Sequence, residues 1–155
     1  VNINLFGVIN GIYSAVDLLK NTKNSLCLNT SSSTGIIGLP MTSVYSASKH
    51  AVKGLTESLS AEFRRYGIKV SDILPGVIDT PLINKSIRAS LPNEGMWRLI
   101  PSEDVAKTVY QAYLEEKIHW YVPEELEDLE KLVVENPNKA RDEVISSGPM
   151  KIPSD

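Results

Sequence analysis

Three side chains stand out for what they could do together. Tyr45 and Lys49 lie four residues apart, and Ser32 precedes the tyrosine by thirteen residues. On a helix, side chains at positions i and i+4 share a face, so the phenol and the ammonium can point into one cleft. A phenol titrates near pH ~10 in water, and a cation beside it stabilises the phenolate. With a serine hydroxyl to hold a carbonyl or alcohol oxygen, this set predicts an acid/base site for oxidising alcohols or reducing ketones.

The chain contains a second tyrosine and lysine at the same spacing, Tyr113 and Lys117. The residue thirteen positions before Tyr113 is Ile100, whose side chain cannot donate a hydrogen bond. The surrounding residues have the pattern of an ordinary amphipathic helix. We therefore interpret this second pair as structural.

The composition excludes several classes of function. The chain has 155 residues, a mass of 17.1 kDa, a net charge of −3 and a pI of about 5.5, as expected for one globular domain. Basic residues are neither in excess nor clustered, so we expect no nucleic-acid partner. No apolar stretch is long enough to span a bilayer, and we expect no membrane partner. One cysteine, Cys27, and two histidines cannot form an internal disulfide or a zinc site, and no secretory signal is present, so we expect a reducing, cytoplasmic location without a metal.

Helical and strand patterns alternate along the chain. Apolar spacing and capping residues predict helices at residues 5–19, 43–66, 101–114 and 124–135, with Gly67 ending the second of them. Short apolar runs predict strands at residues 25–30, 68–74 and 119–122. Residues 81–100 have mixed character and predict a loop with short helices. Residues 136–155 contain three prolines and are expected to form a polar tail with little order.

This alternation predicts an α/β fold: a doubly wound parallel sheet with helices on both faces. Functional loops in such sheets follow the carboxyl ends of the strands. Residues 31–33 and 75–80 both follow predicted strands. We therefore expect them to meet at one edge of the sheet, near the tyrosine and lysine.

At this point the sequence resembles the short-chain dehydrogenase/reductase family. Four separated segments match motifs of that family in order and spacing: residues 4–7 (NLFG), 30–32 (TSS), 45–49 (YSASK) and 75–80 (PGVIDT). Thr30 stands where the family usually has isoleucine. The resemblance implies a Rossmann-like fold and an NAD(P)-dependent oxidoreductase that interconverts a secondary alcohol and a ketone or aldehyde.

The resemblance also implies a role for each matched residue. Tyr45 would be the general acid in reduction and the base in oxidation, and Lys49 would lower its pKa and bind the nicotinamide ribose. Ser32 would polarise the substrate oxygen, and Asn4 would hold a water that links Lys49 to solvent. The implied cofactor-binding residues are Thr30, Tyr45, Lys49, Pro75, Gly76, Ile78 and Thr80. The cofactor would be NAD or NADP, which the sequence does not distinguish, and the substrate a small carbonyl or alcohol compound.

The sequence also departs from the family. It contains no Gly-x-Gly-x-x-Gly and no Thr-Gly-x-x-x-Gly-x-Gly phosphate loop. We therefore expect residues 1–135 to be the C-terminal part of an NAD(P)-binding Rossmann-fold domain, inactive as an isolated fragment. The resemblance further implies a homodimer or homotetramer, with the helices beginning at Leu5 and Ser43 as candidate dimer surfaces.

Several alternatives stay open on the sequence alone. The chain could belong to a related epimerase, dehydratase or isomerase with the same tyrosine and lysine, or it could be a truncated, non-catalytic fragment. Asn4 and Thr80 could simply cap helices, and Pro75-Gly76 could simply end a strand. Trp97 could line a substrate pocket or pack in the core.

Overall fold

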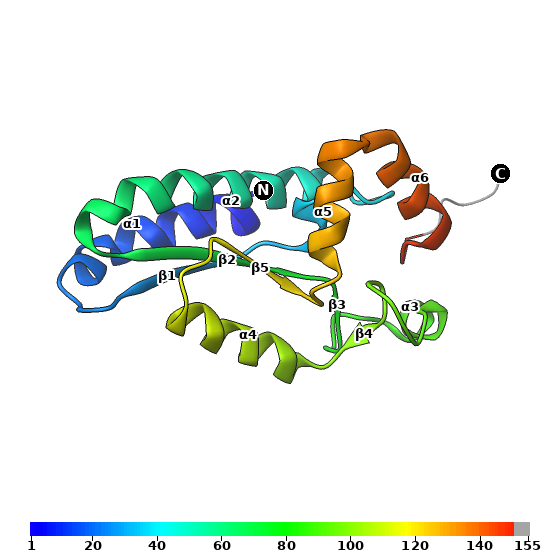
Figure 1. Cartoon of the computed structure of the whole chain (residues 1–155). Coiled ribbons are helices and arrows are strands. Elements are labelled where there is room, and N and C mark those ends of the chain that lie inside the picture. The colour runs from blue at the N-terminus through cyan, green and yellow to red at the C-terminus, as the bar shows by residue number, and fades with distance from the viewer. Residues whose placement is uncertain (151–155) are drawn as a thin grey trace.

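A parallel three-stranded sheet forms the centre of the molecule. The computed structural model describes residues 1–150, and its central strands run in the order β1, β2, β5 (Figure 1). Residues Thr30 and Ile73 pair between β1 and β2, and Asp72 and His119 pair between β2 and β5. The middle strand is buried along nearly its whole length, as expected for a strand covered on both faces. The strands are β1 (Leu26–Thr30), β2 (Lys69–Pro75) and β5 (His119–Val122).

Helices cover both faces of this sheet, which confirms the predicted α/β fold. Helices α1 (Gly7–Lys20) and α2 (Ser43–Phe63) lie on one face, and α4 (Ser102–Leu114) lies on the other (Figure 1). A five-residue π-helical turn, Asn2–Phe6, precedes α1. The core between the sheet and helices α1 and α2 includes Ile12, Cys27, Phe63, Ile68 and Val70. The core on the face covered by α4 includes Ile73, Ile100, Ala112, Trp120 and Val122.

Glycine 67 ends the long helix, as the sequence predicts. A 3-10 turn, Arg64–Tyr66, follows α2, and Gly67 then takes a φ of 70°, in the left-handed region that glycine adopts without strain. The reversal directs the chain into β2. Among residues 1–150, no helix has both the length and the apolar character needed to cross a membrane.

The segment after β2 contains short elements that the sequence pattern does not reveal. Two strands of two residues each, β3 (Val77–Ile78) and β4 (Leu99–Ile100), pair in parallel. Between them lies the short helix α3 (Lys85–Ser90), capped by the Asn84 side chain. Strands this short contain no alternation of polar and apolar residues that could be recognised.

The end of the chain differs from the expected polar tail. After α5 (Leu126–Glu135), a further helix, α6 (Pro137–Ser147), packs against it. The Asn136 side chain accepts a hydrogen bond from the Lys139 amide at 3.0 Å, and Pro137 occupies the first turn, which are favourable signals for a helix start. Ala140 and Val144 of α6 are buried, so the expectation of little order does not fit residues 137–147. Residues 151–155 of the predicted tail lie outside the described residues.

Candidate active site

The first two turns of α2 carry Tyr45 and Lys49 on one face. The ammonium nitrogen of Lys49 lies 5.7 Å from the centroid of the Tyr45 ring, within the range of a cation–π contact. Tyr45 is 40% exposed, whereas Lys49 is 9% exposed. Hydroxyl groups hold this end of the helix, because Thr42 Oγ1 lies 3.0 Å from Ser46 Oγ and Ser48 Oγ donates to the Tyr45 carbonyl at 2.6 Å. The phenol is thus accessible while the cation beside it is sheltered.

Two hydrogen bonds fix Lys49 against the end of β1. Its ammonium donates to the carbonyl oxygen of Thr30 at 2.7 Å, and Ser31 Oγ donates to the Lys49 carbonyl at 3.0 Å. Burial lowers the pKa of Lys49, and no carboxylate within residues 1–150 forms an ion pair with it. Since an ammonium has three donors, the bond to Thr30 leaves others for a ligand.

Asn4 shares a groove with Lys49. A groove of about 500 Å³ runs along the free edge of β1 and the inner side of α1. Asn4, Thr30 and Lys49 all contribute to its lining. Asn4 is partly exposed in the π-helical turn, whose start is not capped by a side-chain hydrogen bond. The structure therefore brings three of the candidate residues to one water-accessible groove.

Ser32 lies in the loop that follows β1, but its oxygen already has a structural contact. The side chain is 8% exposed and its Oγ accepts a hydrogen bond from the Thr34 amide at 3.2 Å, which caps the 3-10 turn Ser33–Gly35. A hydroxyl that accepts one bond can still donate its proton to another oxygen. Within the described residues, neither Tyr45 nor Lys49 forms a hydrogen bond with the Ser32 hydroxyl, so the role of Ser32 stays a prediction.

The segment 75–80 leaves the adjacent strand at the same end of the sheet. The Gly76 amide donates to the Val122 carbonyl at 2.7 Å, and a Cβ on Gly76 would lie 3.3 Å from Pro123 Cδ and 3.5 Å from the Met96 carbonyl. This close approach explains why glycine follows Pro75. Ile78 pairs with Ile100 in the small sheet, and the Thr80 hydroxyl is half-buried with only a 3.5 Å contact to the Ile78 carbonyl. Thr80 therefore has a hydroxyl that is available to a ligand.

Sequence reasoning missed two residues that support this site. Ser31, rather than Ser32, bonds to the Lys49 backbone, and the signal for it was its place one residue nearer the strand. Gly35 lies against the same atoms: a Cβ there would come within 2.6 Å of Ser31 Oγ and 3.1 Å of the Lys49 carbonyl. Glycine at that position allows the loop to pack on α2.

The structure separates the second tyrosine and lysine. Helix α4 ends at Leu114, so Lys117 lies beyond it and pairs with Glu127 at 3.0 Å. The Lys69 ammonium, and not that of Lys117, lies over the Tyr113 ring at 5.1 Å. Trp97 is 3% exposed and packs in a core with Leu126 and Leu129 of α5.

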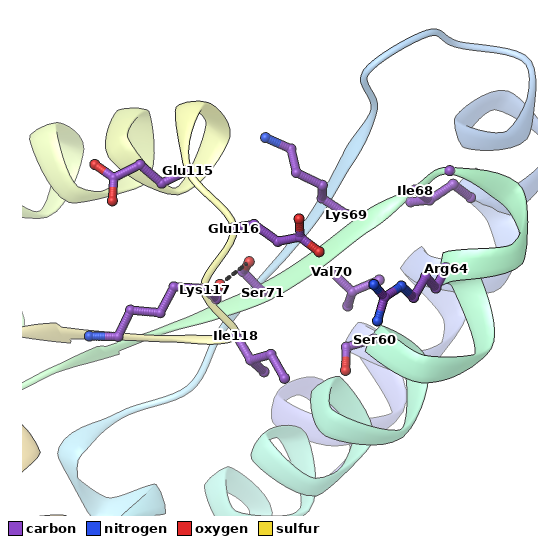
Figure 2. A pocket seen from close by; sticks show the side chains of 11 residues that line it. Ser60, Arg64, Ile68, Lys69, Val70, Ser71, Glu115, Glu116, Lys117 and Ile118 are labelled. Carbon is purple, nitrogen blue, oxygen red and sulfur yellow. Dashed lines mark hydrogen bonds between the residues drawn. The ribbon is translucent and has the colours of Figure 1, made fainter.

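A second groove lies at the opposite end of the sheet. It has a volume of about 540 Å³ and is formed where β2 and β5 begin (Figure 2). Side chains of both charges surround it, including Arg64, Lys69 and Glu116, and Ser71 donates to the Lys117 carbonyl across it. None of the candidate catalytic residues lines this groove.

Comparison with known proteins gives a consistent result. A family model described as short chain dehydrogenase matches residues 1–90. Levodione reductase of Leifsonia aquatica is 39% identical over 88 residues, which are 57% of this chain and 33% of that protein. The chain thus spans about a third of the length of this curated relative.

Solved structures are similar over more of the chain. A short chain dehydrogenase from Burkholderia cenocepacia J2315 in complex with NADP superposes with a TM-score of 0.76, covering 92% of this chain and 56% of that one, and at 22% identity it shows the fold alone. A 4-hydroxyisoleucine dehydrogenase complexed with NADH and succinate superposes with a TM-score of 0.65 at 25% identity, covering 78% of this chain and 54% of that one.

Proposed function

The chain belongs to the short-chain dehydrogenase family, and on that premise we propose that it carries the catalytic residues of an NAD(P)-dependent oxidoreductase that interconverts a secondary alcohol and a ketone or aldehyde. The observation that supports this most strongly is the arrangement of Lys49. Its ammonium is buried beside the Tyr45 ring and bonded to a neutral carbonyl, so its charge is not neutralised by a carboxylate. A cation in that position favours the phenolate form of the tyrosine.

We assign the proton steps to the residues of this chain. In reduction, the Tyr45 hydroxyl donates its proton to the substrate oxygen, and Lys49 stabilises the phenolate that remains. The Ser32 hydroxyl donates a hydrogen bond to the same oxygen and orients it. The groove shared by Lys49 and Asn4 connects the site to solvent, from which the phenolate is reprotonated. In oxidation the same steps run in reverse.

The residues present fit a nicotinamide cofactor. Lys49 has unused ammonium donors that suit ribose hydroxyls, and the Thr80 hydroxyl is accessible after β2. Thr30 at the end of β1 pairs with Ile73 near the end of β2, so residues 75–80 leave the sheet next to the loop that contains Ser32. We propose that Pro75, Gly76, Ile78 and Thr80 line the nicotinamide side of the site. The bound cofactor supplies the hydride.

We propose the activity for the protein that contains this chain. Because the chain spans a third of the length of levodione reductase, we expect the 155 residues alone to be inactive. The proposed substrates are small carbonyl or alcohol compounds.

Tyr13, Leu18 and Val44 are exposed on α1 and α2, and we propose that these helices form a dimer surface. Sedimentation of the wild type and of a Val44→Glu variant would test this proposal.

A direct test measures the oxidation of NADH or NADPH by the full gene product in the presence of a ketone. The panel of ketones includes levodione and the ketone derived from 4-hydroxyisoleucine. Tyr45→Phe removes the transferable proton, so we expect kcat to fall by about 10²–10⁴-fold. The fluorescence titration of the reduced cofactor should be little changed, because Lys49 and residues 75–80 remain.

The matched control is Tyr113→Phe, which removes a hydroxyl from the other tyrosine and lysine pair. We expect this variant to keep wild-type kcat, since Tyr113 lies outside the site on α4. Full activity of Tyr45→Phe, or equal losses in both variants, would contradict the assignment. Failure of the full gene product to bind either cofactor would favour a non-catalytic role.

A further inference from the structure

A cluster of charged and polar side chains connects the second half of α2 to the sheet and to α5. It is separate from the tyrosine and lysine of the candidate site. Four elements contribute to it: α2, β2, β5 and α5. We call it the charged array, and it consists of Lys53, Glu57, Asp72, His119, Tyr121 and Glu130.

His119 lies between two carboxylates in this array. Its Nδ1 is 2.7 Å from Asp72 Oδ1 and its Nε2 is 3.2 Å from Glu57 Oε1. Lys53 continues the array, with its ammonium 2.7 Å from Glu57 Oε1 and 2.8 Å from Glu130 Oε1. The Tyr121 hydroxyl donates to the other oxygen of Glu130. Both nitrogens of one imidazole therefore face acceptor oxygens.

The protons of this trio can be counted. A neutral imidazole has one N–H, and two ionised carboxylates have none. With that single proton, only one of the two contacts of His119 can be a hydrogen bond, and the other brings two lone pairs together. One additional proton, on the imidazole or on a carboxyl group, makes both contacts hydrogen bonds.

The burial of Asp72 supports the same count. Its side chain is 0% exposed, and its Oδ2 has no hydrogen-bond partner within residues 1–150. An ionised carboxylate in such a place is costly unless a cation neutralises it or a proton binds to it. Burial raises the pKa of Asp72, partly offset by the hydrogen bond from His119. The half-exposed Glu57, in contrast, can be solvated.

We propose that Asp72, His119 and Glu57 form a partly buried proton-binding site, which at neutral and mildly alkaline pH keeps one proton in addition to the N–H of a neutral imidazole and thereby holds α2 against β2 and β5. The charged groups around this site have opposite effects on its affinity for the proton. Lys53 on α2 opposes the bound proton, and Glu130 on α5 favours it, while Tyr121 on β5 remains neutral because burial and Glu130 raise its pKa. Within residues 1–150, no group of three His, Cys, Asp or Glu side chains is arranged to hold a metal ion. The inference does not depend on the proposed enzymatic function.

The linkage to stability has a definite sign. In the unfolded chain a histidine loses its proton near pH ~6.5, and an aspartate near ~3.9. If the folded state keeps the proton above that pH, it binds more protons than the unfolded state, and stability falls as pH rises. One proton of difference raises the unfolding equilibrium constant by up to about tenfold per pH unit above pH ~6.5.

The first test uses the wild-type protein, so it needs no variant to fold. Nitrogen NMR at pH 7.5 distinguishes an imidazole with two N–H groups from one with a single N–H, and carbon NMR reports the protonation of Asp72. We expect either two N–H groups on His119 or a protonated Asp72 carboxyl. A neutral His119 together with ionised Asp72 and Glu57 would overturn the proposal.

The second test compares the only two histidines of the chain. Urea unfolding between pH 6.5 and 8.5 should become easier with pH in the wild type and in His50→Gln, since His50 is exposed and, within residues 1–150, hydrogen-bonds only to the Ser46 carbonyl of its own helix. We expect His119→Gln to lose this dependence. The same pH dependence in His119→Gln as in the wild type would also overturn the proposal.

Discussion

Two lysines one helical turn apart, Lys49 and Lys53, differ in almost every respect except residue type. Lys49 is buried against a backbone carbonyl at the carboxyl end of the sheet, and burial lowers its pKa. Burial acts on Lys53 in the same direction, but hydrogen bonds to Glu130 and Glu57 outweigh it and raise its pKa. The pKa values of two neighbouring lysines are thus shifted in opposite directions by what each one faces.

This difference separates a chemical role from a structural one within one helix. The positive charge of an ammonium that has no carboxylate partner can stabilise a negative charge on the neighbouring tyrosine or on a ligand. An ammonium between two carboxylates holds the elements that carry them together. The difference is consistent with the catalytic role that we propose for the first half of α2, whereas the ion pairs of the second half hold the helix against α5.

The largest difference that we predict between the two lysines is in kcat. In the nicotinamide assay of the full gene product, Lys49→Met should lower kcat by about 10²-fold or more, because the phenolate of Tyr45 loses its neighbouring cation. Lys53→Met should leave kcat within about threefold of wild type. Equal losses of activity in both variants, at a temperature where circular dichroism shows that both are folded, would contradict the different roles of Lys49 and Lys53.

Two glycines test how closely each half of α2 is packed. A Cβ on Gly35 would meet Ser31 Oγ at 2.6 Å and the Lys49 carbonyl at 3.1 Å, so Gly35→Ala should destabilise the protein by about 1–3 kcal/mol. Gly54 is next to Lys53 on the exposed side of α2 and has nothing within 4 Å of such a Cβ. Gly54→Ala should stabilise by about 0.5–1 kcal/mol. Urea unfolding measures both changes. A Gly35→Ala variant as stable as the wild type would show that the loop around Gly35 can move away from the added methyl group, contrary to our expectation.

Lys53 should matter more for stability than an exposed lysine with an equally short ion pair. Lys53→Met leaves Glu57 and Glu130 without their cation, and we expect a loss of about 1–2 kcal/mol, reduced from the value for a fully buried pair because the group is partly exposed. Lys107 pairs with Asp104 at 2.8 Å on the surface of α4. Lys107→Met should not shift the urea midpoint measurably, and equal shifts in the two variants would contradict the structural role of Lys53.

Much of the first half of α2 could be predicted from the sequence because its signals are local. The i, i+4 spacing of Tyr45 and Lys49, the glycine that ends the helix region and the strand before each loop are all short-range patterns. They predicted the parallel sheet and the helices on both faces. What they could not supply was the hydrogen-bond partner of each group, such as the Thr30 carbonyl for Lys49 or the Thr34 amide for Ser32.

The charged array could not be predicted, for a physical reason. Asp72 and His119 are 47 residues apart and meet only because β2 and β5 pair in a particular register. Read alone, an aspartate inside an apolar strand conflicts with burial, and the sequence gives no indication of its partner. The helix α6 was missed differently: Asn136 and Pro137 are correct helix-start signals, but they occur in a polar segment where few apolar residues indicate packing.

The smallest predicted effect concerns alkaline pH and follows from the opposite shifts of the two lysines. Between the lowered pKa of folded Lys49 and the ordinary lysine value of 10.5, the unfolded chain keeps a proton that Lys49 loses on folding, so within that window the contribution of Lys49 to stability rises with pH. The pKa of Lys53 is raised, so its contribution is complete below 10.5 and is lost as pH rises above it. Measured by urea unfolding from pH 8 to 11, the advantage of wild type over Lys49→Met should grow with pH, and that over Lys53→Met should shrink at the alkaline end. Each slope is expected to stay below about 1.4 kcal/mol per pH unit, the limit for one proton. Slopes of the same sign would mean that the carboxylates around Lys53 do not hold its proton, and that the two lysines differ only in position.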